Sequence, residues 1–160
     1  MEFRIDIGEI NMKQNMIKHF LNLNKNGGKL IKRQINEDEI VLCDGYFFFI
    51  QDREKMVLNE KLFTELDSDI FTKIIEDEGY VEGKIACFLP THRKNKFNIL
   101  IKNTEEDILD NRVIVNKEKL DLFDYSKIEV KGQTDVVKVY DIKGKLLGGV
   151  LPLRCSDYNI

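Results

Sequence analysis

The segment Val136-Val-Lys-Val-Tyr-Asp-Ile-Lys-Gly-Lys-Leu-Leu-Gly-Gly-Val-Leu-Pro-Leu-Arg154 is the most informative part of the chain. Residues 136–141 and 146–154 are mostly apolar or β-branched, which is typical of strands. Ile142-Lys143-Gly144 separates them and predicts a tight turn, because glycine adopts turn conformations without steric cost. The chain is therefore expected to end in an antiparallel hairpin that closes on Leu151-Pro152-Leu153-Arg154.

Two earlier segments predict helices. Residues 11–25 place apolar side chains on one half of a helical wheel and polar ones on the other, and the polar half has no carboxylate. Asn11 and Gln14 form a variant of the capping box, and Asn26-Gly27-Gly28 predicts the helix end. A second, short helix is expected over 116–123, with Asn116 as its N-cap.

The remaining segments predict an antiparallel sheet. Strands are expected at 3–7, 29–35, 39–51, 79–89, 97–102, 113–115 and 127–131, a strand or short helix at 56–66, and a further short helix at 68–75. The continuous apolar run 46–50 indicates burial on both faces, and Asp44-Gly45 predicts a bulge or turn before it. We expect an α+β fold, mainly antiparallel sheet with two principal helices, in a single domain over 1–160 whose halves, 1–75 and 79–154, repeat the order of helix then strands.

We expect a cytoplasmic protein with an apolar core. Hydrophobic residues make up 42% of the 160 residues and charged residues 33%. The start of the chain has no basic region followed by an apolar run, and no apolar segment is long enough to cross a membrane. The odd number and wide spacing of Cys43, Cys87 and Cys155 favour reduced, buried thiols over disulfides or a zinc site.

Positive charge is concentrated in two segments, although the net charge is −3. Residues 10–36 contain six lysines and arginines and no acidic residue, and residues 91–96 add Arg93, Lys94 and Lys96. Such a face favours a polyanionic partner, whereas a solvated helix without a partner would show the same pattern.

The sequence carries no catalytic signature. It lacks the zinc-protease, phosphate-binding, dinucleotide-binding and nucleophile-elbow motifs. His19 is expected to be a partly buried packing residue, and His92 lies in a basic loop where it suits a phosphate contact better than catalysis. Acidic clusters at 76–78 and 105–107 are expected to be solvated turns, because adjacent carboxylates cannot all converge on one ion. We therefore expect no enzyme, no metal and no cofactor.

Three features resemble a domain of the bacterial DNA sliding clamp. They are the acid-free polar face of helix 11–25, the segment Leu42-Cys43-Asp44-Gly45, which shares Asp-Gly with the "ATDG" segment of clamps, and the order of Val115-Asn116, Leu120, 128–130 and 136–154. The ending Leu151-Pro152-Leu153-Arg154 is similar to the Met-Pro-Met-Arg end of a clamp. The resemblance covers about half of the chain and is strongest over residues 113–154.

The resemblance implies a clamp-like, DNA-associated scaffold of phage or mobile-element replication. Double-stranded DNA would contact Lys18, Lys25, Lys29, Arg93 and Lys94, and a peptide of a replication protein would bind a pocket lined by Val139, Leu151, Pro152 and Leu153. A bacterial clamp subunit has three such domains, so a ring of this chain would be a homo-oligomer of six copies. An alternative remains open: the acidic segments 52–82 and 105–124 would mimic DNA in a small protein-binding module or inhibitor that contacts no nucleic acid.

Overall fold

The computed structural model describes residues 12–103 and 112–154. In chain order its elements are α1 (Gln14–Lys25), β1 (Ile31–Gln34), β2 (Glu39–Cys43), β3 (Phe47–Asp52), the 3₁₀ turns Arg53–Lys55 and Glu60–Leu62, β4 (Thr64–Glu65), α2 (Ile70–Glu76), β5 (Val81–Pro90), β6 (Phe97–Asn103), β7 (Val113–Asn116), α3 (Lys117–Leu120), β8 (Lys127–Val130), β9 (Val137–Tyr140) and β10 (Leu146–Val150). The expected α+β class is confirmed, and the described residues contain three α-helices: the two principal ones and the further short one.

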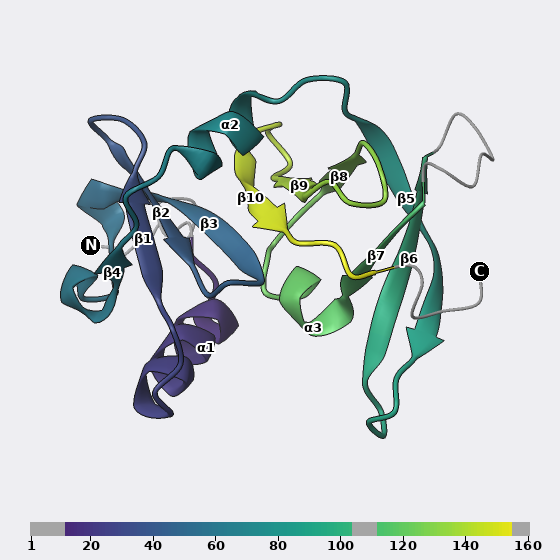
Figure 1. Cartoon of the computed structure of the whole chain (residues 1–160), viewed down its shortest axis with the longest axis horizontal. Coiled ribbons are helices and arrows are strands. Elements are labelled where there is room, and N and C mark those ends of the chain that lie inside the picture. The colour runs from purple at the N-terminus through teal and green to yellow at the C-terminus, as the bar shows by residue number, and fades with distance from the viewer. Residues whose placement is uncertain (1–11, 104–111, 155–160) are drawn as a thin grey trace, which may run out of the picture.

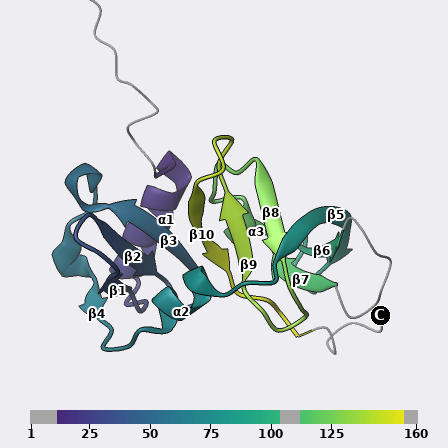
Figure 2. The same ribbon diagram turned by 90° about the horizontal axis from the view of Figure 1, so that it is seen from above.

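Ten strands form one sheet in the order β4-β1-β2-β3-β10-β9-β8-β5-β6-β7 (Figures 1 and 2). All neighbours are antiparallel except β1 and β4. The predicted C-terminal hairpin is β9–β10, and it lies in the middle of the sheet because β10 also pairs with β3. Gly148 and Gly149 make this close approach feasible, since a Cβ atom on Gly148 would lie 2.0 Å from the carbonyl oxygen of Phe48.

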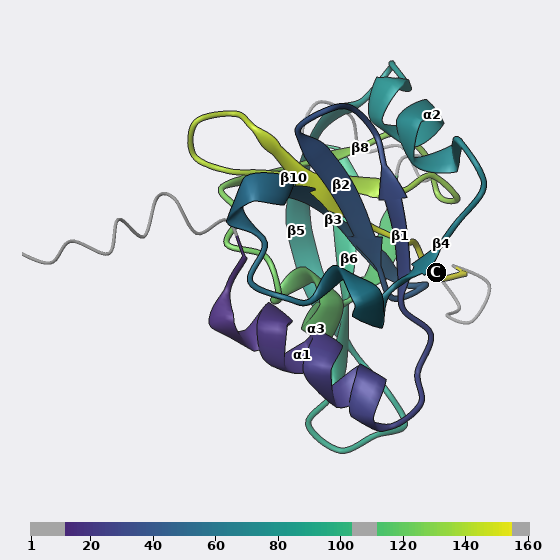
Figure 3. The same cartoon turned by 90° about the vertical axis from the view of Figure 1, so that its left-hand side faces the viewer.

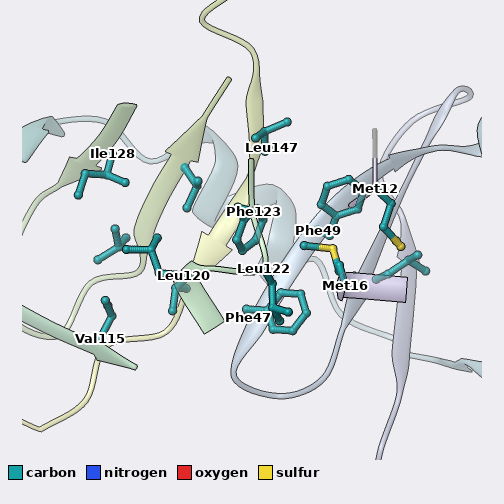
Figure 4. Close-up of a cluster of buried hydrophobic side chains, with 14 of the residues drawn as sticks. Met12, Met16, Phe47, Phe49, Val115, Leu120, Leu122, Phe123, Ile128 and Leu147 are labelled. Carbon is teal, nitrogen blue, oxygen red and sulfur yellow. The ribbon is translucent and has the colours of Figure 1, made fainter. Parts of the chain in front are cut away.

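Helices cover both faces of the sheet, and α1 and α2 lie on opposite sides of β1–β3 (Figure 3). The main core joins α1 and α3 to one face, and Figure 4 shows its side chains, among them Met16, Phe47 and Leu120. A second cluster packs Phe71 of α2 against the other face through Phe48 and its neighbours. Residues 47–50 of β3 are buried on both faces, as the apolar run predicted, whereas Tyr46 at the start of that run is exposed.

The sequence predicts the C-terminal end of α1 correctly and its N-terminal end wrongly. Gly27 has a φ of 75°, and the amide of Gly28 donates to the carbonyl of Leu23 at 2.7 Å, which is the Schellman ending expected from Asn26-Gly27-Gly28. The predicted capping box is wrong, because the helix begins at Gln14 with Lys13 as its N-cap and no side-chain cap bond. Met12 is buried in the core and fixes the chain before the helix.

Other boundaries follow the predictions with small shifts. The helix expected at 68–75 is α2, the segment 56–66 contains a 3₁₀ turn and β4, and Asp44-Gly45 forms a tight turn with a φ of 95° at Gly45. Asn116 is the N-cap of α3, although this helix ends at Leu120 rather than at Phe123. The strand expected at 3–7 lies outside the described residues.

Two cysteines lie in the described part of the chain, and both are free. Cys43 is buried, and burial raises the pKa of its thiol to about 11. Cys87 is exposed, so the prediction of a buried thiol is wrong there, while Cys155 lies outside the described residues. No helix in the described ranges is both long and apolar enough to span a membrane.

Candidate nucleic-acid interface

Helices α1 and α3 lie next to each other, although they are about 100 residues apart in the chain. The Lys13 ammonium and the Asn15 amide of α1 both donate to the carbonyl of Asp121, which ends α3, at 3.3 Å. Between the two helices lies a shallow hollow of about 290 Å³, lined by Lys18, His19 and Lys119 among others. The polar side of α1 is therefore continuous with α3.

The β5–β6 turn, residues 91–96, continues this surface on the other side of α3. Lys96 of the turn forms an ion pair with Glu118 of α3. A hollow of about 570 Å³ lies between turn and helix, lined by His92, Arg93 and Asn116 among others. Figure 1 shows α1, α3 and the tip of the β5–β6 ribbon along one side of the molecule. We call these three elements together the cationic face.

All five residues predicted to contact DNA belong to the cationic face or flank it. Lys18 and Lys25 are exposed on α1, Lys29 is exposed just after it, and Arg93 and Lys94 are exposed in the turn. Among the described residues, no carboxylate forms an ion pair with any of these five. Their charges are therefore available to a polyanion.

Besides Lys13, which contacts Asp121, two further cations of the basic segment 10–36 have different roles. Lys32 of β1 forms an ion pair with Glu60 at 3.2 Å, and Arg33 forms one with Asp69 at 3.0 Å. These contacts attach β1 to the segment that precedes α2. Lys32 and Arg33 therefore stabilise the fold and do not extend the cationic face.

A buried carboxylate, which sequence reasoning noticed only as part of an Asp-Gly turn, joins the helices. The side chain of Asp44 is 1% exposed, and its Oδ2 atom lies 2.8 Å from both His19 Nε2 of α1 and Lys119 Nζ of α3. Its Oδ1 atom accepts hydrogen bonds from the amides of Tyr46 and Phe47. One side chain thus connects the β2–β3 turn with both helices.

The charge of Asp44 is stabilised by these contacts. Burial by itself would raise the pKa of this carboxyl, but the hydrogen bonds from His19, Lys119 and the two turn amides outweigh burial and lower the pKa to about 2. The Lys119 ammonium also lies 5.3 Å from the centre of the Tyr46 ring. Lys119 is thus neutralised within the protein, and the free charge of the cationic face comes from α1 and the turn.

The four residues predicted to line a peptide pocket do not form one pocket. Val139 is fully buried in the main core, because β9 lies in the middle of the sheet, so its inclusion was wrong. Leu151 is exposed, Pro152 is half-buried, and the amide of Leu153 donates to the carbonyl of Ile114 at 2.7 Å. Leu153 also lines the 570 Å³ hollow beside Arg93.

The alternative interpretation, a protein-binding module that mimics DNA, requires its acidic side chains to form one face. The described acidic side chains do not form an uninterrupted face. Asp77, at the end of α2, forms an ion pair with Lys131 at 2.9 Å, and Glu76 lines a hollow together with Lys145. Residues 105–107 lie outside the described residues. Because lysines alternate with these carboxylates, the described acidic surface is mixed in sign.

Within the described residues, no three His, Cys, Asp or Glu side chains gather as metal ligands would. Comparison with protein-family models, with curated proteins and with solved structures finds no match for the chain. The assignment of a function therefore depends on the geometry of the cationic face.

Proposed function

We propose that this protein is a non-enzymatic, clamp-like scaffold that binds double-stranded DNA through its cationic face. The observation that carries the proposal is that two basic segments far apart in the sequence, α1 and the β5–β6 turn, flank α3 on one continuous surface. Lysine and arginine side chains on such a surface neutralise phosphates without reading bases, which suits a protein that holds DNA of any sequence.

The charge distribution supports one orientation on DNA. The whole chain has a net charge of −3, so the surfaces outside the cationic face are negative overall and repel phosphates. Lys18 and Asn22 face the hollow between the helices, where lysine and amide side chains can contact the same phosphate. DNA would therefore lie along α1 and α3 rather than across the sheet.

The order of elements supports the clamp-like part of the proposal. A helix followed by three antiparallel strands occurs as α1-β1-β2-β3 and again as α3-β8-β9-β10, and the two units meet where β3 pairs with β10. We infer that halves 1–75 and 79–154 are related units of one domain. In this proposal Leu151 and Pro152 remain the contact for a peptide of a replication protein.

DNA affinity measured against salt concentration tests the proposal. The variant carries Lys18→Gln and Lys25→Gln, because glutamine nearly matches lysine in helix propensity and only the charges are lost. The matched control carries Lys73→Gln and Lys145→Gln, two exposed lysines on α2 and beside it, on the opposite face of the sheet. Binding of a fluorescent duplex is followed by anisotropy.

Each lost phosphate contact should reduce the slope of log affinity against log salt by about 0.9, which is roughly tenfold in affinity at about 0.1 M salt. The Lys18/Lys25 variant should therefore bind about 100-fold more weakly, and the control, which loses the same two charges away from the cationic face, should bind like wild type. Equal losses in both variants, or no duplex binding by wild type, would refute the proposal. Light scattering separates a six-copy ring from an open scaffold.

A further inference from the structure

We propose that Phe88 and Phe97, on the β5–β6 ribbon beside the cationic face, form a stacking platform for an unpaired nucleobase. This inference deepens the proposed function, on which it rests, by naming the DNA structure preferred: duplex with a single-stranded extension. Phe88 is 52% exposed and Phe97 39% exposed, although all the other phenylalanines of the described residues are buried. Two adjacent exposed aromatic rings indicate a binding surface.

The position of the platform follows from the strand register. Phe88 pairs with Ile99, and Phe97 precedes Ile99 by two residues, so all three side chains lie on the same face of the ribbon. Ile99 is buried in the main core, whereas the ribbon extends beyond the core at Phe88 and Phe97. The ring centres lie 6.3 Å apart with an interplanar angle of 45°, which gives one continuous aromatic surface.

Charged side chains of both signs border this aromatic surface. The Lys117 ammonium of α3 lies 5.6 Å from the centre of the Phe88 ring. A hollow of about 300 Å³ is lined by both rings, by Lys96 and Lys117, and by Glu118 and Asp121, the carboxylates that form ion pairs with these two lysines. On the side of the turn, Phe97 lines the 570 Å³ hollow together with Arg93, which forms no ion pair with the described residues. A base can stack on the ring while this guanidinium neutralises its phosphate.

A nucleobase fits this surface better than an apolar peptide does. The hollow beside Phe97 contains the guanidinium of Arg93, which forms no ion pair with the described residues and which a purely apolar partner would leave without a hydrogen-bond acceptor. A base in a duplex is stacked on both sides and cannot use the rings, so only an unpaired base can. Duplex on α1 and α3 would thus place a single-stranded extension over the ribbon.

Binding of three fluorescent DNAs tests the inference: a blunt duplex, the same duplex with a short oligothymidine extension, and oligothymidine alone. The variants are Phe88→Ala, the ring-preserving Phe88→Tyr, and Ile142→Ala as a control, which removes an exposed apolar side chain from the β9–β10 turn. Circular dichroism checks that each variant is folded, as the exposure of Phe88 leads us to expect.

Wild type should bind the extended duplex at least about fivefold more tightly than the blunt one, since stacking of one base on an aromatic side chain is worth that much or more. Phe88→Ala should abolish this preference and weaken oligothymidine binding, with no change for the blunt duplex, while Phe88→Tyr and Ile142→Ala should behave like wild type. Equal wild-type affinity for blunt and extended duplex, or an Ala variant that keeps the preference, would overturn the inference.

The failure of this inference is distinguishable from failure of the proposed function. Blunt-duplex binding that depends on Lys18 and Lys25 but shows no preference for an extension would overturn the platform alone. Binding of oligothymidine that depends on Phe88, without binding of the blunt duplex, would overturn the duplex scaffold and support the platform. Absence of binding to all three DNAs would overturn both.

Discussion

Replacing Asp44 by asparagine tests whether one buried carboxylate holds the two helices of the cationic face together. Asparagine has nearly the size of aspartate and keeps an oxygen that can accept from the amides of Tyr46 and Phe47. It lacks the negative charge that faces His19 and Lys119 at 2.8 Å. The substitution therefore removes the charge contacts and leaves the turn in place.

The pKa of Asp44 sets the expected size of the effect. Its value falls from the ordinary 3.8 to about 2 in the folded protein, which corresponds to about 2 kcal/mol of stability near neutral pH. A fully buried ion pair would cost more free energy of unfolding when broken. We expect the smaller loss here, because the side chains of His19 and Lys119 remain 24% and 19% exposed and keep contact with water.

The sign of the pH dependence follows from the lowered pKa. Because the folded protein releases this proton more readily than the unfolded chain, the stabilisation is complete above about pH 5 and is lost as the pH falls through about 2. Near pH 3 about half of it should remain. The difference in stability between wild type and Asp44→Asn should shrink accordingly.

Urea unfolding followed by circular dichroism measures this difference near pH 7 and near pH 3. Asp124→Asn is the matched control, since Asp124 is exposed and forms no ion pair with the described residues, and it should change the free energy of unfolding by less than about 0.5 kcal/mol. A loss for Asp44→Asn that is equally large at both pH values would refute the electrostatic explanation. A loss no greater than that of the control would show that the carboxylate does not join the helices.

Two further substitutions test local features that the fold depends on. Asn116→Ala should destabilise the protein by about 1 kcal/mol, because the Asn116 side chain accepts the amide of Lys119 at the start of α3, and Asn116→Asp should restore most of the loss in urea unfolding. Gly148→Ala should cost at least about 3 kcal/mol or prevent folding, because its Cβ would lie 2.0 Å from the Phe48 carbonyl oxygen at the β3–β10 junction. If the Gly148→Ala variant unfolded at a thermal midpoint near that of wild type, this result would contradict the observed pairing of β10 with β3.

Most elements could be predicted from local patterns in the sequence. Gly27 and Gly28 ended α1, Asn116 started α3, and alternating or continuous apolar runs marked the strands. The start of α1 could not be predicted from its capping residues, because burial of Met12 in the core determines where the chain enters the helix. Val139 was assigned to a surface pocket because the sequence does not show that β10 lies between β9 and β3.

In the candidate site, too, the sequence predicted some features, whereas others depend on tertiary packing. The charges of Lys18, Lys25 and Arg93 were evident from the sequence, but their presence on one surface depends on how α1, α3 and the β5–β6 turn pack. Asp44 was noticed only as part of a turn, since its partners His19 and Lys119 are 25 and 75 residues away. The exposed pair of Phe88 and Phe97 gave no sequence signal, because buried and exposed strand phenylalanines look alike in sequence.

The sequence by itself determined the α+β class, the acid-free polar side of α1 and the turns of the C-terminal hairpin, because these depend on residues a few positions apart and on backbone preferences. Only the tertiary structure decided that β10 pairs with β3, that Asp44 connects two helices and that the basic segments share a face. These features arise from contacts between distant segments, and such contacts are selected by the packing of the whole core rather than by any local pattern.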